Sequence, residues 1–133
     1  MTSVRVTSND SHFGQDVTIR QFRLAADEPP TLGGDDAGPT PCEWMLTALG
    51  SCKAITLKMY AERKGWKLDR VSVDLTYEAQ AGEAKIEANL TLEGDLTEEQ
   101  RQRLREISDR CPVQKLLKQP TQIQTQLLAQ TPD

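Results

Sequence analysis

One segment of the chain, residues 39–66, restricts the fold more than any other. Its stretch from Trp44 to Leu57 is apolar or small on almost every side of a helix, and Lys53 is the single charged residue in it. These fourteen residues are too few to cross a bilayer, which takes about 20. A helix that is apolar all round is normally buried all round. We therefore predict a central helix that the rest of the fold covers.

Both ends of this helix carry recognisable signals. Thr40, with Glu43 three residues later, predicts an N-terminal capping box. Pro39 and Pro41 fit the approach to a helix or its first turn. Gly65 predicts the C-terminal stop, because glycine readily adopts the left-handed conformation found there. The helix should therefore begin and end close to these residues.

Length and charge favour a small acidic domain. The 133 residues predict a single domain, 1–133. A net charge of −4, without a cluster of lysine and arginine among aromatic residues, argues against nucleic acid or an anionic membrane as partner. The first ten residues lack the apolar stretch of a secretion signal, and three cysteines is an odd number. We therefore expect a cytoplasmic protein with reduced thiols.

The remaining secondary structure follows from alternation, turn residues and caps. Alternating apolar residues predict strands, and a second capping box at residues 97–100 predicts a second helix that ends near 110. The resulting order, β-β-α-β-β-α-β, indicates one α+β domain. The expected elements are an edge strand at 1–9, a strand or hairpin arm at 17–24, a loop at 26–41, an antiparallel hairpin of 68–77 with 84–92, a short helical piece at 113–118 and a last strand at 122–128.

Two of the cysteines lie where they could act together. Cys52 lies in the middle of the apolar helix among small residues, and Cys111 continues the apolar stripe of the second helix just before Pro112. Such a pair could be redox-active if the fold brings the two Cα atoms within about 7 Å. Cys42 is a poorer partner for Cys52, because ten helical residues rise about 15 Å. The alternative is that Cys52 is only a small packing residue.

Other chemistry finds less support. The chain has no CxxC pair and a single histidine, His12, which lies in a predicted turn, so a zinc site is not expected. No G-K-[ST] follows Gly33 and Gly34, so a phosphate loop is not expected either. We predict no cofactor. A reactive thiol does need a nearby cation, and Arg20 and Arg23 are the candidates.

Two blocks of sequence resemble the OsmC/Ohr family. The first is G-P-x-P-x-E-x-x-L-x-A-L-G-S-C at 38–52 with its continuation at 57–66, and the second runs from 96–100 to R-C-P-V at 110–113. The resemblance covers roughly residues 17–128. It implies an α+β fold with two curved antiparallel sheets around long central helices, formed by an intertwined homodimer. A second protomer would then cover the apolar helix.

The resemblance also implies an activity. Peroxidase members of the family reduce organic hydroperoxides or hydrogen peroxide with two cysteines and no cofactor. Carried over residue by residue, Cys52 is the peroxidatic cysteine, which becomes a sulfenic acid. Cys111 is the resolving cysteine, which forms a disulfide with it. A dithiol reductant would then reopen the disulfide.

The sequence departs from the peroxidase pattern around its acidic residue. In peroxidase members an acid directly follows the proline and holds an activating arginine, whereas Cys42 has that position here. Glu43 comes next and is the remaining candidate acid, although nine residues, about 900°, place it on the opposite side of a straight helix from Cys52. Gln114 stands where relatives with C-P-V-H have histidine. The alternative function is therefore a non-peroxidase that binds a small apolar ligand or acts as a thiol redox sensor.

Overall fold

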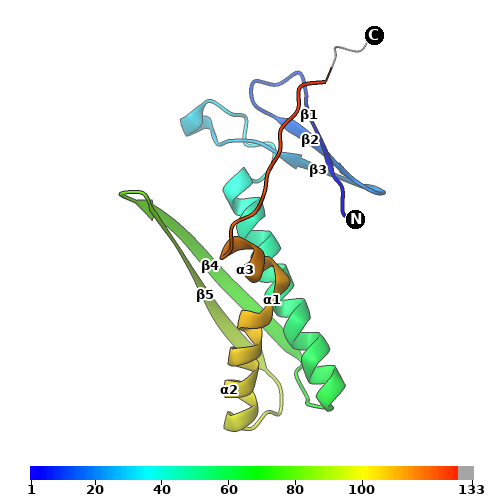
Figure 1. Cartoon of the computed structure of the whole chain (residues 1–133), viewed down its shortest axis with the longest axis vertical. Coiled ribbons are helices and arrows are strands. Elements are labelled where there is room, and N and C mark those ends of the chain that lie inside the picture. The colour runs from blue at the N-terminus through cyan, green and yellow to red at the C-terminus, as the bar shows by residue number, and fades with distance from the viewer. Residues whose placement is uncertain (129–133) are drawn as a thin grey trace.

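The computed structural model, which describes residues 1–128, has two separate antiparallel sheets joined by one long helix (Figure 1). The α+β class expected from the sequence is confirmed. In chain order the elements are β1 (Arg5–Ser8), β2 (Gln15–Ile19), β3 (Phe22–Ala26), the 3-10 turn η1 (Pro30–Leu32), α1 (Pro41–Lys64), β4 (Arg70–Gln80), β5 (Glu83–Glu93), α2 (Glu98–Ile107), the 3-10 turn η2 (Ser108–Arg110) and α3 (Pro112–Leu117).

Helix α1 begins and ends as the sequence predicts. The Thr40 hydroxyl accepts a hydrogen bond from the Glu43 amide at 3.1 Å, and the Glu43 carboxylate accepts one from the Thr40 amide at 2.8 Å. These two bonds satisfy amide groups that have no partner within the helix. Gly65 ends the helix at φ 72°, in the left-handed region. The caps therefore fix the register of α1 and the position of Cys52 along it.

The three-stranded sheet lies at the N-terminal end of α1, away from β4 and β5 (Figure 1). Its strand order is β1-β2-β3, with β1 at the edge as expected. The single hairpin arm anticipated at 17–24 is instead two strands, because Arg20 turns the chain at φ 51°. Val6, Val17 and Leu24 are direct cross-strand neighbours and form an apolar row on one face.

The second sheet is a long hairpin that packs against α1. Ala81 and Gly82 both have positive φ, the combination that a two-residue type I′ turn requires. The hairpin lies so close to α1 that a Cβ at Gly50 would be 2.7 Å from a methyl group of Leu75. The small residues around Cys52 therefore do allow a close neighbour, and on the Gly50 side that neighbour is β4.

The main core lies where the C-terminal half of α1 meets α2 and the hairpin. Leu57 and Leu104 are fully buried at its centre, and the side chain of Trp66 packs against it. Helix α2 contributes through a narrow apolar stripe, as its sequence predicts. The other buried members of this cluster are Ala61, Leu68 and Ile107.

Truncation of Leu57 tests this core. We expect Leu57→Ala to lower the free energy of unfolding by about 2–5 kcal/mol, because it removes buried methyl groups and leaves a cavity between two helices. Urea denaturation followed by circular dichroism measures the loss. Arg63→Ala in the last turn of the same helix is the matched control, because Arg63 is exposed. An equal loss in both variants would contradict the assignment of Leu57 to the core.

The prediction that α1 is covered all round is not met within one chain. The hairpin and the α2–α3 region cover one side of the helix only. Ile55 and Met59 on the other side are 55% and 58% exposed, and Ala48 and Ser51 on that side are also exposed. We refer to Ala48, Ser51, Ile55 and Met59 as the outer face of α1.

The last strand expected at 122–128 is absent. Residues 120–128 have no regular secondary structure and follow α3 as an extended stretch (Figure 1). Their apolar residues pack against no other element, since Ile123 is 83% and Leu127 is 100% exposed. Both sheets of residues 1–128 have open edges, but this segment pairs with none of them, so the alternating pattern alone does not specify a strand here.

None of the helices in the described part of the chain is both long and apolar enough to cross a membrane.

Candidate thiol site

Cys52 and Cys111 come from different elements and differ in exposure. Cys52 lies in the middle of α1 and is partly buried. Cys111 is fully buried at the start of α3, where Pro112 occupies the first helical position. The Cys111 sulfur accepts a hydrogen bond from the Gln114 amide at 3.4 Å and so acts as the N-cap. The local sequence C-P-x-Q thus fixes the direction of the Cys111 side chain.

The fold brings these two cysteines together. Burial raises the pKa of the Cys111 thiol, and the neighbouring Cys52 side chain raises it further. Backbone amides of Val113 and Gln114 oppose the shift, but burial is the larger effect. All three cysteines of the chain are free thiols. The proximity that spacing alone could not establish is therefore present in the reduced single chain.

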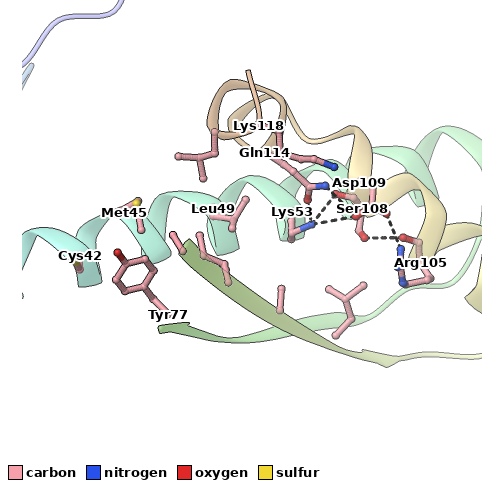
Figure 2. A pocket seen from close by; sticks show the side chains of 15 residues that line it. Cys42, Met45, Leu49, Lys53, Tyr77, Arg105, Ser108, Asp109, Gln114 and Lys118 are labelled. Atoms are coloured by element: carbon pink, nitrogen blue, oxygen red, sulfur yellow. Dashed lines mark hydrogen bonds and ion pairs between the residues drawn. The ribbon is translucent and has the colours of Figure 1, made fainter. Parts of the chain in front are cut away.

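Cys42 does not join the pair. It is exposed in the first turn of α1, near Tyr77 of β4 (Figure 2). The rise of about 15 Å over ten helical residues separates it from Cys52, as expected from the sequence.

The acid and the arginines considered from the sequence are engaged elsewhere. The Glu43 carboxylate caps α1. The Arg20 guanidinium lies 5.1 Å from the centre of the Phe22 ring, and an Arg23 nitrogen donates to the Arg20 carbonyl at 3.4 Å. Both arginines belong to the three-stranded sheet beyond the start of α1 (Figure 1). Within one chain, none of the three contacts Cys52 through the interactions described.

A buried lysine is the feature that sequence reasoning missed. Lys53 follows Cys52 in the sequence, but its side chain projects from the helix about 100° further round, so the sequence predicts no contact with the thiol. In the structure it is only 4% exposed, and its ammonium points toward Ser108, Asp109 and Gln114 (Figure 2). It donates to the Ser108 carbonyl at 3.1 Å and to the Gln114 side-chain carbonyl, and it lies 3.7 Å from an Asp109 oxygen. A charged residue inside an apolar run was the available signal, since a buried charge requires partners.

A cavity of about 680 Å³ opens beside this lysine, between α1, the hairpin and the η2–α3 region (Figure 2). Its wall is apolar along the hairpin and polar around Lys53 and Asp109. Hydrogen bonding from Arg105 lowers the pKa of Asp109, and the Gln114 side chain and Lys53 lower it further, so Asp109 is an anion at neutral pH. The apolar lining residues are Met45, Leu49, Ala84, Ile86, Ala88, Leu90 and Leu117.

Metal chemistry gains no support from the described residues. They contain no group of three or more histidine, cysteine, aspartate or glutamate side chains that could hold a metal ion. His12 is exposed, as expected, stacks on Phe13 and hydrogen-bonds through Nδ1 with the Gly33 carbonyl. It therefore joins two loops of the N-terminal region, on a different part of the chain from the thiol pair.

The family model described as OsmC-like protein matches residues 33–126, which include α1, Cys52 and Cys111. The chain belongs to the OsmC-like protein family. The resemblance noted in the two sequence blocks is thereby confirmed. No curated protein sequence matches the chain.

Solved structures of OsmC-like proteins share the fold at low sequence identity. An OsmC-like protein from Mycoplasma pneumoniae is 16% identical, with a TM-score of 0.76 over 89% of this chain and 87% of that one. An organic hydroperoxide resistance protein OsmC from Legionella pneumophila is 16% identical, with a TM-score of 0.66 over 89% of each chain. The organic hydroperoxide resistance protein OhrB of Bacillus subtilis is 19% identical, with a TM-score of 0.58 over 89% and 90%. At these identities the likeness establishes the fold.

Proposed function

We propose that this OsmC-like protein is a thiol-dependent peroxidase that reduces organic hydroperoxides or hydrogen peroxide with Cys52 and Cys111. The observation that carries the proposal is the pairing of a partly exposed thiol on α1 with a buried thiol at the start of α3. The family relationship supports it, because relatives with this fold include proteins described as organic hydroperoxide resistance proteins.

The different surroundings of the two thiols assign their roles. Cys52 is accessible in part and can meet a peroxide, whereas Cys111 is fully buried. The raised pKa of Cys111 keeps it protonated at neutral pH, so it is a poor nucleophile toward peroxide. A thiol with these properties suits the second step, in which its only partner is the neighbouring Cys52.

The reaction balances with a dithiol as the final reductant. The Cys52 thiolate attacks one peroxide oxygen, the O–O bond breaks, and the alkoxide leaves with a proton as an alcohol. Cys52 is then a sulfenic acid, oxidised by two electrons. The Cys111 sulfur attacks the Cys52 sulfur, the S–O bond breaks, and hydroxide leaves with the Cys111 proton as water. The dithiol returns two electrons to the resulting disulfide by thiol–disulfide exchange.

A homodimer is part of the proposal. The outer face of α1 and the apolar row of the three-stranded sheet both lack cover within one chain. Exposed apolar surfaces of this kind mark interaction sites. A second protomer would cover them and could bring an arginine of its own sheet to Cys52. A catalytic role for Glu43 stays a prediction, because its carboxylate is occupied by the helix cap in the single chain.

A second candidate function rests on the cavity. About 680 Å³ with an apolar wall suits a small apolar ligand, and the acid position of the peroxidase pattern holds Cys42. In this reading the protein binds a small molecule or senses oxidants, and the thiols are not turned over.

Intact-mass measurement after one equivalent of cumene hydroperoxide separates the two functions. The peroxidase proposal predicts a loss of two hydrogens within the mixing time, mapped by peptide analysis to a Cys52–Cys111 disulfide. Subsequent dithiothreitol should restore the original mass and allow further turnover. An unchanged mass would overturn the peroxidase proposal and favour ligand binding. A Cys52 sulfenic acid that persists without forming the disulfide would favour a sensor.

A further inference from the structure

The buried ammonium of Lys53 requires an explanation beyond the proposed reaction. Burial of a charge is costly unless partners replace the lost water. Lys53 is 4% exposed and lies on the covered side of α1. An apolar residue at this position would pack against the same neighbours without that cost. The function of this lysine is therefore inferred from the groups that its ammonium contacts.

All the partners of this ammonium come from one short segment, 108–114. A lysine ammonium has three donors and no acceptor. In the structure they face the Ser108 carbonyl, the Gln114 side-chain oxygen and the Asp109 carboxylate. Two of its donors are used in hydrogen bonds to Ser108 and Gln114, and the carboxylate of Asp109 adds an ion pair from the same segment.

This segment carries Cys111 between its anchor points. Ser108 and Asp109 precede the cysteine, and Gln114 follows it. Gln114 contacts both sides of the arrangement, because its side-chain oxygen accepts from Lys53 while its backbone amide donates to the Cys111 sulfur at 3.4 Å. Its side-chain nitrogen also donates to Asp109 at 3.2 Å. Lys53 is thus linked to the Cys111 sulfur through a single residue.

Lys53 is also the sequence neighbour of Cys52 in the regular helix α1. The rigid backbone of α1 fixes the position of one relative to the other. A lysine that anchors the Cys111 segment to the residue next to Cys52 therefore sets the separation of the two sulfurs. The 3-10 turn η2 and the helix α3 are short, with three and six residues. They have little regular structure of their own to hold Cys111 in place.

We propose that Lys53 is a positioning residue that holds Cys111 against Cys52 and thereby favours formation of their disulfide. Its meaning in a catalytic cycle rests on the proposed function, but the positioning itself does not. Without this anchor, the 108–114 segment would sample more conformations when reduced, and closure of the disulfide would have to overcome that lost order.

The test measures the stability of the disulfide without any peroxide. Wild-type protein and Lys53→Met are equilibrated in glutathione redox buffers, and the Cys52–Cys111 disulfide is quantified by alkylation and peptide mass. We expect Lys53→Met to require about tenfold more oxidising conditions, which corresponds to about 30 mV in reduction potential. The matched control is Lys58→Met on the same helix, because Lys58 donates only to the carbonyls of Leu68 and Asp69. This control should keep the wild-type potential.

A second variant keeps the test decisive if Lys53→Met does not fold. Gln114→Leu removes the link between Lys53 and Cys111 at a partly exposed position and should shift the potential in the same direction. Unchanged potentials in folded variants would overturn the positioning role, and so would failure of wild-type protein to form this disulfide in oxidised glutathione. A disulfide that forms in glutathione but not with cumene hydroperoxide would leave the positioning intact and reject only the peroxidase.

Discussion

Replacement of Cys52 by serine is expected to lower peroxide consumption, measured with dithiothreitol as reductant, by at least about 100-fold. A serine hydroxyl at neutral pH supplies almost none of the nucleophilic anion that a cysteine supplies. The proposed first step has no other accessible nucleophile at this position, because Cys111 is fully buried and protonated. The loss should appear in kcat/KM for cumene hydroperoxide. The folded state should persist, since the two side chains are nearly equal in size.

Two further cysteine variants make this result specific. Cys111→Ser should still react once, and its Cys52 sulfenic acid should accumulate and be trapped by dimedone, because no partner thiol is present to release water. Cys42→Ser should keep wild-type turnover, since Cys42 is exposed in the first turn of α1. Full activity in Cys52→Ser would eliminate the proposed mechanism. Loss of activity in Cys42→Ser would instead give the first turn of α1 a part in the reaction.

Local signals predicted the two ends of α1 correctly because they act within a few residues, whereas α2 ends at Ile107 instead of near 110 and β4 runs to Gln80 instead of residue 77. The capping box of Thr40 and Glu43 and the stop at Gly65 are confirmed, since their hydrogen bonds close within one turn. The hairpin of β4 and β5 is confirmed as well, because its turn residues and alternation lie in one continuous stretch. Local hydrogen bonds and alternation are thus sufficient for this part of the fold.

The two predictions that were wrong both concern which surface packs against an apolar segment, and the sequence cannot specify that surface. Alternation at 122–128 resembled a strand, but in residues 1–128 this segment pairs with neither sheet. The apolar run of α1 suggested burial on all sides, but Ile55 and Met59 stay exposed in one chain. Both patterns respond to a surface that lies far away in the sequence or on another molecule. A hydrophobic pattern therefore shows that cover is needed without showing what supplies it.

The residues of the candidate site also divide into those that the sequence indicated and one that it did not. The sequence indicated Cys52 and Cys111 through their blocks, and the fold places them together. For Lys53 its charge within an apolar run was a signal, but spacing did not reveal its partners, because the angle around α1 directs this side chain away from Cys52 and the return of the chain at 108–114 brings the partners to it. Contacts between α1 and the segment 108–114 cannot be predicted from the spacing of residues within either one.

The outer face of α1 leads to the second large expected effect. We expect wild-type protein to have twice the mass of one chain in solution and Ile55→Glu to have the mass of a single chain. In a symmetric dimer each substitution occurs twice in one interface, so two carboxylates would be buried without partners. Dissociation should be at least about 100-fold easier, which sedimentation equilibrium measures. Gln80→Glu, which adds the same charge at the exposed end of β4, should remain dimeric.

Ile55→Glu also tests whether dimer formation affects the accessibility of the Cys52 thiol. Cys52 lies about 20° from Met59 and 60° from Ile55 around the helix, so a partner seated on the outer face would cover part of the thiol. Ile55→Glu should therefore speed alkylation of Cys52 by iodoacetamide, while Cys42, exposed in the single chain, should react at an unchanged rate. A dimeric Ile55→Glu protein with unaltered Cys52 alkylation would place the interface elsewhere. A monomer with unaltered alkylation would separate the thiol site from assembly, because the partner then contributes nothing to its cover.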